Sequence, residues 1–176
     1  NKYHITGAAP VVEGQGMLSN SGNTAFAIFE GIDPKLQPTV SPIGSKMIQG
    51  HLSSLQPGQF NVILGRDLAL NLGVDVGDKV MFYIPKATLT PVGMIPRMKM
   101  FTVSGIFKVS YQFDNNYVLL NYKDAAALLQ MGDYVSGLQL KLTNLFLAPQ
   151  VVQTLSKVLP AGFQVSFDGE TVYCKN

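Results

Sequence analysis

Side chains able to carry out catalysis are sparse in this sequence, and they do not cluster. His4 and His51 are its two histidines, and neither belongs to a spacing that binds metal, so we interpret both as surface or structural residues. The single cysteine, Cys174, has no histidine near it in sequence and cannot form an internal disulfide. Because catalysis needs several titratable groups that converge, we expect no enzyme, no metal site and no cofactor.

Asp75 and Asp78 lie three residues apart, a spacing that a pair of catalytic acids can adopt. The segment around them is rich in glycine and valine, which favours a turn, so we interpret both as turn and cap residues. A small hydrolase that uses this pair is the alternative. The glycines at 14–16 and 65–66 lack both the dinucleotide-binding fingerprint and the phosphate-binding loop.

The apolar patterns around these residues predict an α+β fold, with a mixed or antiparallel sheet and short helices. Of the 176 residues 47% are hydrophobic, enough to bury a core, so intrinsic disorder is excluded. The expected strands are 10–17, 24–32, 61–64, 79–84, 98–107, 117–120, 135–142 and 163–167, and the expected helices are 68–72, 122–131 and 148–159. We expect one domain over 1–176, with two intertwined subdomains as the alternative.

The chain carries few charges. Only 14% of its residues are charged, against about 25% in an ordinary soluble domain, so part of the surface is expected to be covered. A net charge of +2 predicts no nucleic-acid partner. No stretch approaches the roughly 20 apolar residues that span a bilayer, and no signal peptide is visible. The abrupt start at Asn1 and the polar end indicate a processed protein or an excised domain.

Residues 85–97 depart from these patterns. They connect two expected strands, and the connection is longer than the roughly 2–5 residues usual in hairpins. Three prolines stiffen it, and the sequence Thr-Pro-Val-Gly at 90–93 suits a tight turn at its tip. The tip is apolar through Leu89, Val92, Met94 and Ile95. A long, stiff, apolar loop is either a flap over its own core or a docking element.

Positive charge and methionine both concentrate around this loop. Residues 79–113 contain five basic residues and no acidic one, and the remaining 8 basic and 11 acidic residues give the rest of the chain a net charge of −3. Four of the seven methionines lie between 81 and 100. Because methionine adapts to varied surfaces, this composition favours a partner that has an apolar pocket with an acidic rim.

Five short stretches carry a resemblance to a known family. The runs ILGRDLA at 63–69 and LGVDVGDKV at 72–80 resemble the MacB-like periplasmic core superfamily. APVVEGQGML at 9–18 and GIDP at 31–34 are similar to the LolC/LolE family, the permeases of lipoprotein-releasing ABC transporters. TPVGMIP, within 85–98, resembles the protruding hairpin, or hook, of the LolC-type subunits, which the LolE-type subunits lack.

The resemblance implies the periplasmic domain of an inner-membrane permease in a Gram-negative bacterium, held between transmembrane helices. It implies that the hook binds the periplasmic carrier LolA and hands over lipoproteins, while LolE and the ATPase LolD complete the complex and LolD hydrolyses ATP. The implied hook residues are Pro85, Lys86, Leu89, Thr90, Pro91, Val92, Gly93, Met94, Ile95 and Pro96. A pad at the base of the hook is implied at Met81, Arg97, Met98 and Lys99.

Met81 and Met98 depart from the polar or basic character expected of pad residues, whereas Lys99, helped by Arg97, keeps the charge. Besides the small hydrolase, the alternative is a LolE-like or other MacB-type permease domain, which handles substrate or couples motion without docking the carrier. A loop folded back onto its own sheet would favour this alternative.

Overall fold

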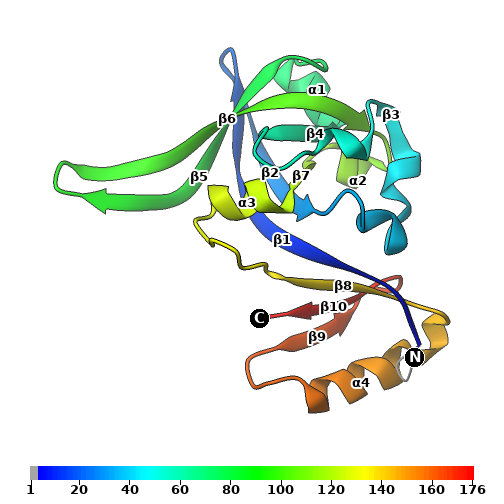
Figure 1. Ribbon diagram of the computed structural model, residues 1–176. Helices are drawn as coiled ribbons and strands as arrows, with labels where there is room; N and C mark the ends of the chain where they lie inside the picture. The colour runs from blue at the N-terminus through cyan, green and yellow to red at the C-terminus, as the bar shows by residue number, and fades with distance from the viewer. Residues whose placement is uncertain (1–3) are drawn as a thin grey trace.

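A closed ring of strands forms the main body of the protein (Figure 1). The computed structural model describes residues 4–176, without the side chains of residues 86–88 and 94. In order around the ring the strands are β1 (Ile5–Asn20), β2 (Asn23–Ile32), β7 (Tyr117–Asn121), β4 (Asn61–Gly65), β6 (Gly93–Phe107) and β5 (Lys79–Thr90). The ring closes because β5 pairs with β1. The β2–β7 and β4–β6 pairs are parallel, and the other pairs are antiparallel.

Strand β1 also belongs to a second, smaller sheet. Its first half pairs with β8 (Gly137–Leu142), followed outward by β10 (Val172–Lys175) and β9 (Gln164–Phe167). Val11 marks the crossing point, since it lies opposite Ile32 of β2 on one edge and Gly137 of β8 on the other. A short strand, β3 (Met47–Gln49), pairs with the end of β6.

Short helices cover the two sheets. They are α1 (Arg66–Leu72), α2 (Tyr111–Asp114), α3 (Tyr122–Leu128) and α4 (Ala148–Val158). Helix α1 ends where Gly73 takes a left-handed conformation with φ of 68°, which a glycine adopts without strain. Helix α4 lies against the small sheet, with Val151 and Leu155 on its buried face (Figure 1). Two 3-10 turns, Gln37–Thr39 and Pro42–Lys46, lie in the proline-containing segment between β2 and β3.

Aromatic side chains fill the centre of the ring of strands. Phe82 contacts Phe29 with ring centroids 5.8 Å apart and Phe101 with centroids 4.9 Å apart, both edge to face, a favourable arrangement of aromatic quadrupoles. All three side chains are fully buried. A separate cluster between α4 and the small sheet contains Leu140, Val172 and Cys174. The ring and the small sheet therefore have separate hydrophobic cores joined by β1, and a third hydrophobic cluster contains Leu55, Ile63 and Phe107.

The predicted mixed sheet with short helices is confirmed. The loop that the local patterns predict over 85–97 is wrong, because β5 and β6 run through that segment and leave a tight turn at its tip. The β-hairpin that the family resemblance implies is present in this segment. Helix α3 ends at Leu128, earlier than expected, and Gln130 then takes a positive φ of 53°. The sequence patterns did not predict β3, β10 and α2, which are each 3 or 4 residues long. The expectation of one domain over 1–176 stays a prediction.

A polar layer lies between the ring and the small sheet. Gln139 of β8 is buried and donates through its Nε2 to Glu30 Oε1 of β2. Glu30 lies directly opposite Glu13 in the β1–β2 register, and Lys175 Nζ is 2.7 Å from Glu13 Oε2. Burial, together with the nearby negative charge of Glu13, raises the pKa of Glu30 to about 7, although Gln139 and Lys175 favour the charged form. The charge of Asp168 also raises this pKa.

This layer predicts how stability depends on pH. In the folded protein the pKa of Glu30 is about 7 against 4.5 for an ordinary glutamate, so the folded state holds the proton more tightly. The contribution of Glu30 to stability is therefore present below about pH 4.5 and is lost as the pH rises through 7. Glu30→Gln should raise the free energy of unfolding at pH 8 by on the order of 1–3 kcal/mol, with a smaller effect at pH 4.5.

Urea denaturation of wild type and Glu30→Gln at both pH values measures this difference. Carboxylates that do not interact with Glu30 titrate equally in the two proteins and cancel. A difference between the two proteins that stays constant with pH would contradict the assignment.

Candidate docking site

Strands β5 and β6 form one continuous hairpin that leaves the ring. Their pairing runs from Lys79 opposite Thr102 to Thr90 opposite Gly93. On its other edge β5 pairs with β1 only at residues 81–83, and β6 pairs with β4 only from Thr102 onward. Beyond these points the hairpin is a two-stranded ribbon that extends away from the body (Figure 1). We call residues 85–96 the hairpin arm.

The arm has an irregular base and a tight tip. The strand register shifts between Ile84 and Thr88, next to Pro85, and such an irregularity accommodates a proline within a strand. At the tip a two-residue turn, Pro91-Val92, joins Thr90 to Gly93, as the sequence predicts. Gly93 has a φ of 120°, which a glycine adopts without strain, and Thr90 Oγ1 donates to the carbonyl oxygen of Gly93 over 2.7 Å.

The tip of the arm is apolar and solvent-exposed. Leu89 is 81% exposed and Val92 is 88% exposed, and Ile95 is also exposed. The interpretation as a flap over its own core is therefore wrong for these residues. The other predicted arm residues Pro85, Pro91, Gly93 and Pro96 are exposed, and Thr90 is partly buried. The side chains of Lys86 and Met94 lie outside the described residues.

At the base of the arm the two faces of the hairpin differ, because side chains alternate along a strand. The outward face carries Met81 and Tyr83 of β5, which lie opposite Met100 and Met98 of β6. Met17 of β1 lies opposite Tyr83 and continues this row onto the next strand. Met17, Met98 and Met100 are exposed. We call these five residues the methionine face.

The predicted pad did not include Met17, Tyr83 and Met100, although Met100 is one of the four methionines that the sequence places around the loop. Alternation along β6 gives a signal for Met100, which lies two residues after the predicted Met98 and so faces the same way. Met17 is brought there by its pairing with β5, and that pairing joins residues far apart in the sequence.

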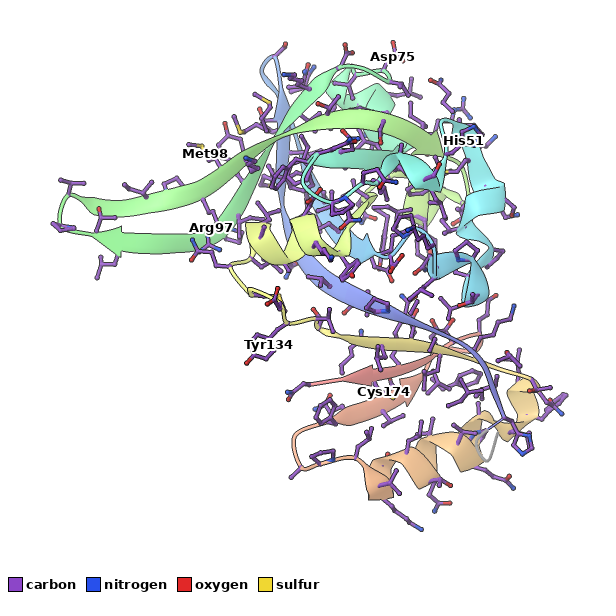
Figure 2. All side chains as sticks on the ribbon, in the orientation of Figure 1. His51, Asp75, Arg97, Met98, Tyr134 and Cys174 are labelled. Carbon is purple, nitrogen blue, oxygen red and sulfur yellow. The ribbon has the colours of Figure 1, made fainter. Side chains whose placement is uncertain are left out.

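Arg97 points to the opposite side of the hairpin from Met98 (Figure 2). Its Nη1 donates to the carbonyl oxygen of Leu128, the last residue of α3, over 3.0 Å. This bond occupies a carbonyl group left unpaired at the end of the helix, where a positive charge is favourable. Arg97 therefore braces the base of the arm against α3.

Lys99 lies on the same side as Arg97, since it pairs with the buried Phe82. Its Nζ is 4.2 Å from the centroid of the Phe60 ring, a cation–π contact, and the residue remains exposed. The structure thus divides the four predicted pad residues between two faces: Met81 and Met98 on one, Arg97 and Lys99 on the other.

The other residues singled out in the sequence do not converge. Asp78 Oδ2 accepts a hydrogen bond from the backbone N–H of Asp75 over 2.9 Å, which confirms the turn-and-cap interpretation. Burial raises the pKa of the Cys174 thiol, which packs in the core of the small sheet. His51, Asp75 and Cys174 lie on separate parts of the molecule (Figure 2). His4, at the start of the described chain, is exposed.

Comparison with known proteins decides the family. The family described as the MacB-like periplasmic core domain matches residues 1–158. This chain belongs to that family. The periplasmic region of MacB from Actinobacillus actinomycetemcomitans has the same fold, with a TM-score of 0.58 and 16% identity over 88% of this chain and 68% of that one. The extracellular domain of YknZ from Gram-positive bacteria also has a TM-score of 0.58, with 9% identity over 88% of this chain and 76% of that one.

Relatives with clearer sequence similarity are transmembrane proteins of lipoprotein-releasing systems. The chain is 39% identical, over 92% of its length, to the lipoprotein-releasing system transmembrane protein LolC of Xylella fastidiosa, and 39% identical over 88% to LolC of Neisseria meningitidis. It is 25% identical over 82% to LolE of Haemophilus influenzae. The chain spans 39%, 38% and 35% of the lengths of these relatives.

The predicted resemblance to the LolC/LolE family and the predicted periplasmic location are confirmed. The predicted MacB-like fold is confirmed as well. Within residues 4–176, no helix has both the length and the apolar character needed to cross a membrane.

The contact of Arg97 with α3 predicts a change in local stability. Arg97→Met keeps much of the side-chain length but removes the donor to Leu128, so the base of the arm should open more often. We expect backbone amide exchange over residues 84–97 to accelerate about fivefold to tenfold, which corresponds to about 1 kcal/mol. Hydrogen–deuterium exchange read by mass spectrometry measures this rate.

Lys99→Met is the matched control, since it removes a charge from the same face and leaves the bond to Leu128 intact. Equal acceleration in both variants would show that the bond to α3 is not what holds the base of the arm.

Proposed function

We propose that this chain is the periplasmic domain of the permease subunit in a lipoprotein-releasing ABC transporter, and that the hairpin arm docks the carrier LolA. The observation that carries the proposal is the exposed apolar tip, with Leu89 and Val92 in solvent at the end of a ribbon free of acidic residues. An exposed apolar cluster of this kind marks a contact surface. The similarity to LolC over most of the chain supports the identity of the transporter.

The shape of the arm suits recognition by insertion. Its two strands are already paired, and three prolines restrict the backbone, so little conformational entropy is lost on binding. Burial of Leu89, Val92 and Ile95 in an apolar pocket would contribute about 1.5–3 kcal/mol for each side chain before the costs of association. Net affinity must stay modest, because a carrier has to leave with its cargo.

The methionine face extends this surface onto the ring. Methionine side chains adapt to the shape of a partner, so Met81 and Met98 would make apolar contacts where the family resemblance implies polar pad contacts. Lys99 faces the other way and stays exposed, so its charge would steer the approach of an acidic rim. Arg97 is engaged with α3 and acts on docking by holding the arm in place.

The remaining partners follow from the same proposal. LolE and the ATPase LolD would complete the complex, LolD would hydrolyse ATP, and lipoproteins would be the cargo. A LolE-like domain or another MacB-type domain that does not dock the carrier is the competing assignment. This competing assignment predicts that LolA does not bind the hairpin arm.

Binding of LolA to this domain tests the proposal. Leu89→Asp and Val92→Asp each place a charge on an exposed tip residue, so the fold should be unchanged. Calorimetric titration with LolA should give a dissociation constant at least tenfold higher for each variant, a loss of about 1.4 kcal/mol or more. The matched control is Leu70→Asp, the same substitution at a residue that is 67% exposed on α1.

Wild type and Leu70→Asp should bind equally well. Absence of binding by wild type, or equal binding by all four proteins, would favour the competing assignment.

A further inference from the structure

A second surface feature lies away from the arm, between the ring and the small sheet. A cavity of about 310 Å³ opens there, lined on the ring side by residues of β2, β6 and β7 and on the other side by residues of β8 and β10. Its acidic lining residues are Glu30, Asp168 and Glu170. Its aromatic lining residues are Phe107, Phe113, Tyr117 and Tyr173.

The wall of the cavity contains an acceptor that the protein leaves unpaired. Gln37 is only 3% exposed, and its Nε2 donates to Gln139 Oε1 over 3.0 Å. Gln139 in turn donates to Glu30, and above pH 7, where the Glu30 carboxylate can only accept, this sets the direction of the chain of bonds. Gln37 Oε1 is buried and has no partner within the described residues. A buried acceptor without a donor is unfavourable, so this oxygen favours a ligand whose N–H group can donate to it.

The charges of the lining residues also favour a ligand with a positive charge. Glu30 lies beside the Gln37–Gln139 chain of bonds, and Asp168 and Glu170 line the cavity from the turn before β10. Asp168 Oδ1 is held by the backbone N–H groups of Glu170 and Thr171, over 2.9 and 2.8 Å. Lys46 is the one basic residue among the described lining residues. The cavity therefore has an excess of negative charge.

The aromatic rings that line the cavity favour an organic cation. Phe113 and Tyr117 lie with ring centroids 5.0 Å apart and form one wall of the cavity. Aromatic faces beside carboxylates attract organic cations. The described residues hold no group of three or more His, Cys, Asp or Glu able to bind a metal ion.

We propose that this cavity binds the ammonium or guanidinium group of an organic cation, with an N–H donated to Gln37 Oε1 and the charge facing Glu30 and the rim acids. The chain's own Lys175 does not fill this role, since it is paired with Glu13. The site is independent of the arm and of LolA docking.

Titration with agmatine, which carries both cationic groups, tests the proposal. At pH 8 we expect saturable NMR shifts of the side-chain amides of Gln37 and Gln139. Gln37→Leu should weaken binding about fivefold or more. Glu170→Gln, at an exposed rim position that does not threaten the fold, should weaken it about threefold, and Lys46→Gln should strengthen it about twofold.

Two further probes separate the possible sources of the cation and test the role of charge. An acetylated and amidated Gly-Arg-Gly peptide that binds more tightly than agmatine would identify a protein side chain as the ligand, and the reverse order would identify a free small cation. Butylurea, which has N–H groups but no charge, should not bind. Shifts that do not saturate, that butylurea reproduces, or that Gln37→Leu and Glu170→Gln leave unchanged would overturn the proposal.

Discussion

Backbone pairing along both edges of β1 is the constraint on which the rest of the structure depends. One edge pairs with β2 for most of its length, and the other is shared between β8 and β5. The first pairing builds the wall of the ring, and the shared edge both closes the ring and supports the small sheet. Every backbone N–H and C=O in a buried sheet needs a partner, so a strand used in this way determines where its neighbours begin and end. The two hydrophobic cores and the cavity between them follow from it.

The direction of the arm follows from the same pairing. Strand β5 has β1 beside it only as far as Tyr83, and past that residue the hairpin has no neighbouring strand. Because side chains alternate at that point, the methionines are placed on one face and the two basic residues on the other. Arg97 then becomes a brace against α3. Arg97, although charged and next to the proposed interface, therefore has a structural role. Apolar residues of the arm tip and the methionine face are the ones exposed to solvent.

Local features of the sequence predicted local structure well. The Thr-Pro-Val-Gly turn at 90–93 and the end of helix α1 at Leu72 each depend on residues a few positions apart, and both occur as predicted. The strands through Pro85 and Pro96 were missed, because a ribbon without outer neighbours tolerates prolines that a central strand does not. The partner of Arg97 and the Gln37–Gln139 bond were also missed. They join residues 31 and 102 positions apart, and only the pairing of distant strands brings these residues together.

The open edges of the arm have a consequence for behaviour at high concentration. A two-stranded ribbon with apolar side chains and unpaired backbone groups can serve as a template for strand addition by another molecule. In the arm, Pro85, Pro91 and Pro96 each remove one N–H from the ribbon, and the register shift after Ile84 interrupts its regular pairing. The backbone therefore resists edge-to-edge self-association. The same prolines that stiffen the arm keep an apolar projection from becoming a site of aggregation.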